Sequence, residues 1–166
     1  MSASTALLDT EARRERADIP AGYAPVPAPP GFVRHSGGCF LHEQRPVVAL
    51  RVLAEHLNSI RIAHGGLLAT LADTACGVVI KRALGLPVPP ATVSLNVDYL
   101  GAVREGDWLE AEVEVLKAGR RITNASCMIR VSRRPVVRAS GVFMMVAPVV
   151  AEPAGGADNA TGIGNL

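Results

Sequence analysis

The segment from Gly65 to Leu84 constrains the fold most, because its apolar residues recur at the spacing of an α-helix. Gly85 and Pro87 then end the pattern, as expected just beyond a helix C-terminus. The apolar positions are Leu67, Leu68, Leu71, Ala72, Ala75, Cys76, Val79, Ile80, Ala83 and Leu84. This apolar surface is broad, so we expect one long and largely buried helix.

A second stripe on the same helix consists of small side chains with one carboxylate among them. Its members are Gly66, Ala69, Thr70, Asp73 and Gly77. No Lys or Arg lies three or four positions from Asp73, so a helical ion pair does not account for it. A carboxylate on such a face can act as a general base toward water or as a nucleophile. The alternative is an Asp that is solvated or bonded to a neighbouring backbone group.

After the helix, apolar and polar residues alternate, which is typical of strands with one covered and one wetter face. This pattern covers 92–100, 109–115 and 121–131, whereas 136–146 is apolar on both faces and is predicted to be central or at an interface. Before the helix, 39–44 and 47–56 are also predicted strands. The expected order is two strands, the helix and four strands in an antiparallel meander, an α+β architecture. A single sheet with one helix leaves its other face uncovered, so we expect an oligomer.

The two ends are rich in Pro, Ala and Gly without a sustained apolar period. We predict a mobile arm over residues 1–30, one domain over 31–147 and a disordered tail over 148–166. The 166-residue chain has a net charge of +2, which argues against a dedicated nucleic-acid binder.

Other function classes are excluded by what the sequence lacks. We expect no signal peptide and no membrane span, since no apolar stretch approaches the ~20 residues required. The three cysteines form no disulfide framework, and the four histidines lack metal-ligand spacing. A cytoplasmic protein without a bound metal is expected.

The helix entrance offers a second chemical group. Gly65 and Gly66 open the helix, where backbone N–H groups lack intrahelical partners and can stabilise an oxyanion. A tight strand-to-helix turn is the alternative explanation for these glycines. His64 is interpreted as a structural or supporting residue, because no G-x-S-x-G sequence follows it. Asn58 lies on the preceding loop, where an amide can orient water or hold the helix entrance.

The sequence HLNSIRIAHGG over 56–66, followed by LAD over 71–73, resembles the hotdog-fold acyl-CoA thioesterases. The specific relatives are those of the phenylacetate pathway and the 4-hydroxybenzoyl-CoA type. GFVRHSGGCF, TVSLNVDYL, REGDWLEAEVEVLKAGRRI and ASGVFMMV also occur in that family's order, so the resemblance covers about residues 31 to 147. It implies a hotdog fold, with an antiparallel sheet wrapped around one long central helix.

The resemblance also implies residue roles. Asp73 matches the catalytic carboxylate, and Gly65 matches the glycine whose amide polarises the thioester carbonyl. Asn58 matches the Asn that positions thioester or water, and His64 the His beside it. Thr92 falls where relatives carry a Ser or Thr that contributes from the facing subunit. Two subunits would place their helices antiparallel and join their sheets, giving a homodimer or a dimer-of-dimers tetramer.

The expected activity is hydrolysis of an acyl-CoA or aryl-CoA thioester, with coenzyme A as part of the substrate and no other cofactor. Arg61 departs from the family, which usually has Gly there, and could bind a substrate carboxylate or a CoA phosphate. Gly66 and the hairpin residues Lys117, Arg120 and Arg121 are the other predicted substrate contacts, although charged hairpin ends also serve solubility. The alternatives are a non-catalytic acyl-CoA sensor, a hotdog hydratase or dehydratase, and a purely structural oligomer.

Overall fold

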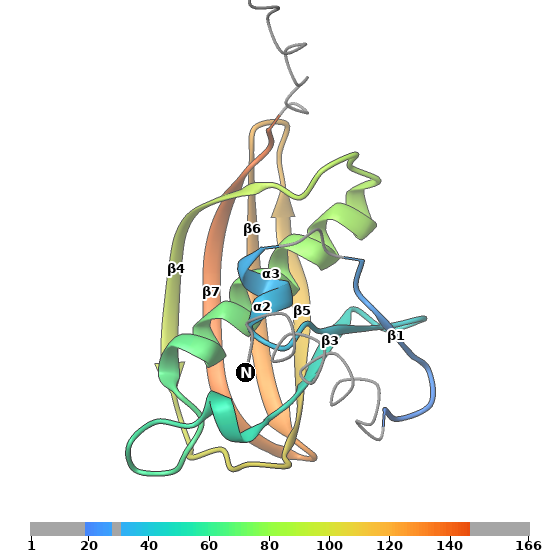
Figure 1. Cartoon of the computed structure of the whole chain (residues 1–166). Helices are drawn as coiled ribbons and strands as arrows, with labels where there is room; N and C mark the ends of the chain where they lie inside the picture. The colour runs from blue at the N-terminus through green and yellow to red at the C-terminus, as the bar shows by residue number, and fades with distance from the viewer. Residues whose placement is uncertain (1–18, 28–30, 147–166) are drawn as a thin grey trace, which may run out of the picture.

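The computed structural model describes residues 19–27 and 31–146 as one antiparallel sheet that wraps around a long helix (Figure 1). The seven strands lie in the order β1-β2-β3-β5-β6-β7-β4, and the α+β prediction is confirmed. The strands are β1 (Tyr23–Pro25), β2 (Phe40–His42), β3 (Val47–Arg51), β4 (Ala91–Tyr99), β5 (Trp108–Ala118), β6 (Ile122–Val131) and β7 (Arg134–Met144). The helices are α2 (Phe32–His35), the 3-10 turn η1 (Ala54–His56) and α3 (Gly65–Leu84).

Helix α3 begins and ends where the sequence predicts. His64 is its N-cap, and Gly85 at its C-cap has a φ of 62°, the left-handed conformation that glycine adopts without strain. Its buried residues are Leu68, Leu71, Ala72, Ala75, Cys76, Val79 and Ile80, which pack on the inner face of the sheet. The predicted apolar surface is too broad at the C-terminal end, where Leu84 is 37% exposed.

The predicted four-strand meander is wrong for β4. Strands β5, β6 and β7 are joined by hairpins, but β4 pairs with β7, with Tyr99 opposite Val137 and Leu95 opposite Gly141. Residues 100–107 cross the end of the sheet, where Leu100 N–H donates to the Val136 carbonyl (2.9 Å). Alternation identifies the two faces of a strand but not its neighbours, so the sequence pattern could not place β4 at the edge.

Strand β3 is also shorter than its predicted range of 47–56. It ends at Arg51, and η1 follows because the Leu53 N–H donates to His56 Nδ1 (3.0 Å). That bond turns the chain away from the sheet before the loop that leads to α3.

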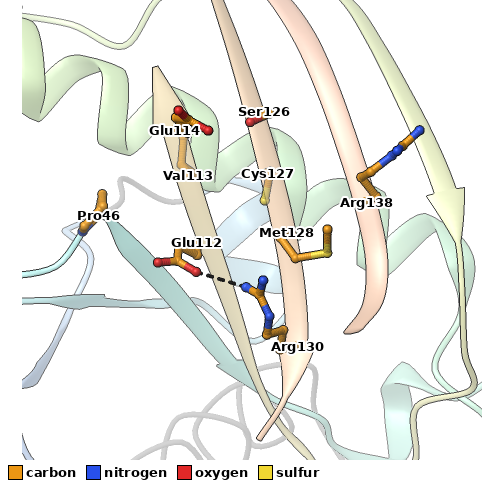
Figure 2. Close-up of a pocket in the computed structure, with 9 residues that line it drawn as sticks. All are labelled: Pro46, Glu112, Val113, Glu114, Ser126, Cys127, Met128, Arg130 and Arg138. Carbon is orange, nitrogen blue, oxygen red and sulfur yellow. Dashed lines mark hydrogen bonds and ion pairs between the residues drawn. The ribbon is translucent and has the colours of Figure 1, made fainter. Parts of the chain in front are cut away.

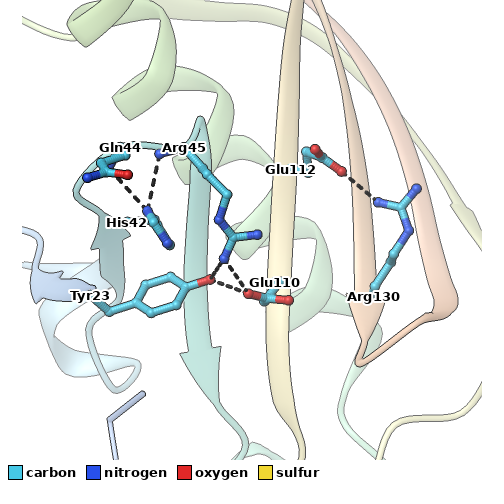
Figure 3. Close-up of polar contacts among 7 residues, drawn as sticks. All are labelled: Tyr23, His42, Gln44, Arg45, Glu110, Glu112 and Arg130. Carbon is cyan, nitrogen blue, oxygen red and sulfur yellow. Dashed lines mark hydrogen bonds and ion pairs between the residues drawn. The ribbon is translucent and has the colours of Figure 1, made fainter. Parts of the chain in front are cut away.

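Residues within the predicted N-terminal arm belong to the sheet. Strand β1 pairs with β2, and Tyr23 donates a hydrogen bond to Glu110 of β5, while Arg45 contacts both side chains (Figure 3). Burial first, and then the hydrogen bond with Glu110, raise the pKa of Tyr23. The mobile-arm prediction is therefore wrong for 23–25. Residues 1–18, 28–30 and the predicted tail from 148 lie outside the described residues.

Candidate active site

Asp73 and Thr92 form a hydrogen-bonded pair between helix and sheet edge. Thr92, on the helix-facing side of β4, donates from Oγ1 to Asp73 Oδ1 over 2.6 Å. Asp73 is partly exposed on α3. Among the described residues no hydrogen bond reaches its second oxygen, Oδ2. The pair therefore holds one carboxylate oxygen in place and leaves the other available to water or substrate.

The entrance of α3 presents one unoccupied amide. The Gly66 N–H donates to His64 Nδ1 (2.9 Å), and the Leu67 N–H donates to the His64 carbonyl (3.0 Å). Within the part of the chain that the structure describes, the Gly65 N–H has no hydrogen-bond acceptor. It points from the positive end of the helix dipole and can donate to a carbonyl oxygen. Gly66 is also predicted to contact the substrate, but its amide already donates its hydrogen bond to His64 and is not available in the same way.

His64 thus acts as the N-cap of α3. Because Nδ1 accepts a hydrogen bond, the neutral ring carries its proton on Nε2. Its own N–H donates to the His56 carbonyl (2.8 Å), which fixes the cap against the preceding turn. The side chain is exposed, so Nε2–H can reach a group bound at the helix entrance.

Asn58 shapes the loop that leads to this entrance. Its Oδ1 accepts hydrogen bonds from the N–H groups of Ile60 (3.1 Å) and Ile62 (3.2 Å). Arg61 lies inside this turn with a φ of 61°, in the left-handed region where its side chain is disfavoured. The backbone here has the geometry of a glycine position, although the residue is Arg. Its guanidinium forms a 3.5 Å ion pair with Glu105, the two side chains being 72% and 52% exposed.

One chain does not bring all of these groups to one point. Gly65 and Asp73 are eight residues apart on α3, which corresponds to about 12 Å along the axis. Reacting atoms must come within about 3–3.5 Å, so these two residues cannot act on the same carbonyl within one chain. Thr92, implied to lie on a facing subunit, contacts Asp73 of its own chain.

The basic residues of strands β5 to β7 and their hairpins include two groups with different surroundings. Lys117, Arg120 and Arg121 are exposed at the β5–β6 hairpin. In contrast, Arg130 pairs with Glu112 (2.9 Å) and Arg138 pairs with Asp98 (3.2 Å).

Arg130 and Arg138 line a hollow of about 480 Å³ on the outer face of the sheet (Figure 2). Figure 2 views this face with α3 behind the strands, and Asp73 is not among its lining residues. The hollow is therefore separate from the candidate active site.

Within residues 19–27 and 31–146, no group of three or more His, Cys, Asp or Glu side chains is arranged to hold a metal ion. None of the helices in these ranges is both long enough and apolar enough to cross a membrane. The three cysteines are free and buried, and burial raises the pKa of Cys39 to about 11.

Comparisons with known proteins show the family of this chain. The family described as the thioesterase superfamily matches residues 60–137. A putative esterase of Pseudomonas aeruginosa is 38% identical over 129 residues, which cover 76% of this chain and 96% of that protein. The chain therefore belongs to the thioesterase superfamily.

Two solved structures extend the likeness to the fold. An Asn-to-Asp variant of the phenylacetic acid degradation protein PaaI of Thermus thermophilus has a TM-score of 0.57 and 27% identity, covering 64% of this chain and 90% of that chain. A hypothetical thioesterase of Streptococcus pneumoniae with coenzyme A has a TM-score of 0.54 and 29% identity, covering 59% and 77%. The predicted hotdog fold and family resemblance are confirmed.

Sequence reasoning missed Tyr99, whose hydroxyl donates to the Gly65 carbonyl over 3.0 Å. The alternation of β4 places Tyr99 on the same face as Leu95 and Val97, toward α3. That periodicity was the available signal, but it did not indicate which part of the helix the side chain meets.

Proposed function

We propose that this protein is an acyl-CoA thioesterase that hydrolyses its substrate to a free acid and coenzyme A. The observation that carries this proposal is the Asp73–Thr92 pair on the small-residue face of α3, in a member of the thioesterase superfamily. The CoA bound to the Streptococcus pneumoniae thioesterase supports coenzyme A as the thiol part of the substrate.

The active site is shared between two subunits. Gly65 and Asp73 are too far apart along α3 to act together within one chain. Gly65 of one subunit therefore acts with Asp73 of a second copy, and the reverse holds for the other site. Antiparallel packing of two α3 helices brings Gly65 of one subunit toward Asp73 and Thr92 of the other.

Strand β4 supports such a dimer, because its described pairing is with β7 alone and it exposes Val93 (59%), with the exposed Leu100 (54%) directly after the strand. A long apolar edge strand is normally covered in a stable protein. The same arrangement allows a dimer of dimers, which light scattering of the purified protein distinguishes from a single dimer.

The groups have complementary roles in hydrolysis. The Gly65 amide and the helix dipole stabilise negative charge on the thioester oxygen. Asp73 either removes a proton from the attacking water or attacks the carbonyl carbon itself. The C–S bond then breaks, and the thiolate of coenzyme A leaves and takes up a proton from water, while the neutral His64 ring can donate a hydrogen bond from Nε2–H to a group at the helix entrance. After direct attack, a water molecule hydrolyses the mixed anhydride with Asp73, which frees the acid and restores the carboxylate. Single-turnover hydrolysis in ¹⁸O-water separates the two routes, since label in the Asp73 carboxylate indicates direct attack.

The substrate contacts follow from charge and position. Arg binds phosphate through bidentate hydrogen bonds, so Lys117, Arg120 and Arg121 are assigned to the phosphates of coenzyme A. Arg61 is assigned to a charged group near the site entrance, and Asn58 to the shape of that entrance. The chain has three Phe, two Tyr and one Trp, so the acyl pocket is built mainly from aliphatic side chains. A cytoplasmic location is proposed, in keeping with the free cysteines.

The test is thiol release from short, medium, long and aryl acyl-CoAs by the wild-type protein and by Asp73→Ala. We expect turnover of at least one substrate and a decrease of about 10² or more in the variant, the size of a lost acid–base group. If acyl-CoA binds but no thioester is hydrolysed, the protein is a sensor. Equal turnover by wild type and variant would contradict the role of Asp73.

A further inference from the structure

The peptide group between Gly65 and Gly66 is held from both sides. Its carbonyl oxygen accepts a hydrogen bond from the Tyr99 hydroxyl (3.0 Å), and its N–H donates to His64 Nδ1 (2.9 Å). The Tyr99 ring also lies against Gly65, since a Cβ built on this glycine would be 3.3 Å from Tyr99 Cζ. Tyr99 therefore contacts this peptide through its hydroxyl and packs on the same residue through its ring.

Two successive glycines would otherwise leave the helix entrance poorly defined. Glycine has more conformational freedom than any other residue, and the first helical turn lacks several intrahelical bonds. The peptide before Gly65 is fixed by its carbonyl, which accepts from Leu67 N–H (3.0 Å) and Leu68 N–H (3.3 Å). Tyr99 and His64 fix the peptide after it. Both peptide planes that flank Gly65 are thus set by contacts.

We propose that Tyr99 is a positioning residue: by holding the Gly65 carbonyl and packing against the Gly65 Cα, it fixes the residue whose N–H, on the preceding peptide, binds the thioester oxygen. The inference rests on the proposed function, in which this amide stabilises the developing charge. Tyr99 acts through the backbone, so it is distinct from the groups that touch the reacting atoms.

The position of Tyr99 on β4 gives that strand two tasks. Thr92 near its start orients Asp73, and Tyr99 at its end orients Gly65. In the shared site, these two contacts belong to opposite halves. Each β4 strand therefore orients the carboxylate of one active site and the amide of the other.

The test compares Tyr99→Phe with the wild type in steady-state hydrolysis. The variant keeps the ring against Gly65 and removes only the hydroxyl. We expect kcat to fall roughly tenfold, less than the 10²–10³ for complete loss of such a donor. KM should change less than twofold, and the melting temperature should stay within one degree or so of wild type. An unchanged kcat overturns the proposal. So does a fall in kcat that is matched by a comparable loss of thermal stability.

The other tyrosine provides a matched control. Tyr23→Phe removes a hydroxyl that contacts Glu110 at the opposite edge of the sheet, outside the proposed site. It should leave kcat unchanged. Equal kcat losses in the two Tyr→Phe variants would overturn a specific role for Tyr99.

A second readout does not depend on activity. Amide hydrogen exchange and ¹⁵N relaxation at Gly65 and Gly66 should show greater motion in Tyr99→Phe, whereas Gly22, beside β1 at the opposite edge of the sheet, should not change. Unchanged Gly65 and Gly66 signals overturn the positioning role even in an active enzyme. If the wild type hydrolyses no thioester while these two amides loosen in the variant, the proposed function fails and the clamp on the helix entrance is retained.

Discussion

The two faces of α3 differ in how fully the rest of the chain covers them. The face toward the sheet is closed within one chain, with Leu71 at 2% exposure and Ala72 and Ile80 at 0%. The opposite face carries Asp73 and Gly77, and a Cβ built on Gly77 would meet only Pro89, at 3.8 Å. The first face has no space left, whereas the second has space that its own chain does not fill.

This difference separates stability from activity along a single helix. Residues on the sheet-facing side contribute through burial and close packing, so their loss should affect folding. In the proposed function, residues on the open side meet water, substrate or a second copy, so their loss should affect turnover. Substitutions on each face test whether the separation holds.

The largest effect is expected for Asp73→Asn on the open face. The amide keeps the size of the carboxylate but cannot act as a base or nucleophile, so kcat should fall about 10²- to 10⁴-fold. The free energy of unfolding should stay near the wild-type value, measured by urea denaturation. Asp98→Asn, an exposed carboxylate on the outer face of β4, is the control and should retain activity. A large loss of stability in Asp73→Asn would contradict the separation, because it would show that the open face also stabilises the fold.

On the sheet-facing side, Ile80→Ala should lower the stability of the fold and leave turnover nearly unchanged. Removing a fully buried side chain leaves a cavity, and the expected loss of unfolding free energy is about 2–5 kcal/mol. The kcat per folded molecule should remain close to wild type at low temperature. Val88→Ala, on the loop after α3, serves as a partly exposed control with a smaller loss. If Ile80→Ala stays folded yet loses most of its turnover, the two faces are coupled.

A smaller effect is expected for Thr92→Val, which keeps the shape of the side chain and removes the donor to Asp73. Hydrogen bonds to charged groups contribute about 1.5–3 kcal/mol, so kcat should fall about 10- to 100-fold. Ser94→Ala removes a hydroxyl from the next part of β4, opposite Val142, and should not change kcat. Similar rates for Thr92→Val and wild type would show that Asp73 does not need this orientation.

The smallest effect is expected for Arg61→Gly. Relief of the left-handed conformation should stabilise the fold by up to about 1 kcal/mol, offset in part by the greater freedom of glycine in the unfolded chain. Arg61→Ala, which keeps the backbone strain and removes the guanidinium, separates this effect from charge. If Arg61 binds the substrate, both variants should raise KM, and only Arg61→Gly should raise the unfolding free energy.

Local signals made the helix predictable, whereas long-range pairing limited the rest. The limits of α3 follow from Gly65 and Gly85, which act on adjacent residues. The edge position of β4 depends on β7, whose paired residues lie 38 (Tyr99 and Val137) to 53 (Ala91 and Met144) positions later. Strand β1 pairs with β2, and its Tyr23 bonds to Glu110, 87 residues away. Neither distance is encoded by the alternation of nearby residues.

The residues of the candidate site also differ in whether a local sequence signal marks them. Asp73 and Gly65 could be predicted because an unpaired carboxylate and a glycine pair are unusual in their own helix. The role of Thr92 depended on the family resemblance, since an exposed Thr at the start of a strand carries no signal of its own. Tyr99 was missed because its partner is a backbone carbonyl, which leaves no trace in residue types.

The placement of β4 also sets an order of events for a chain emerging from the ribosome. Strand β4 is synthesised directly after α3, but its hydrogen-bonding neighbour, β7, is the last strand of the sheet. Thr92 and Tyr99 therefore have no fixed approach to α3 until the final hairpin has formed. Because such distant pairings form slowly, we expect catalytic competence to appear late in refolding, after most of the helical signal has recovered.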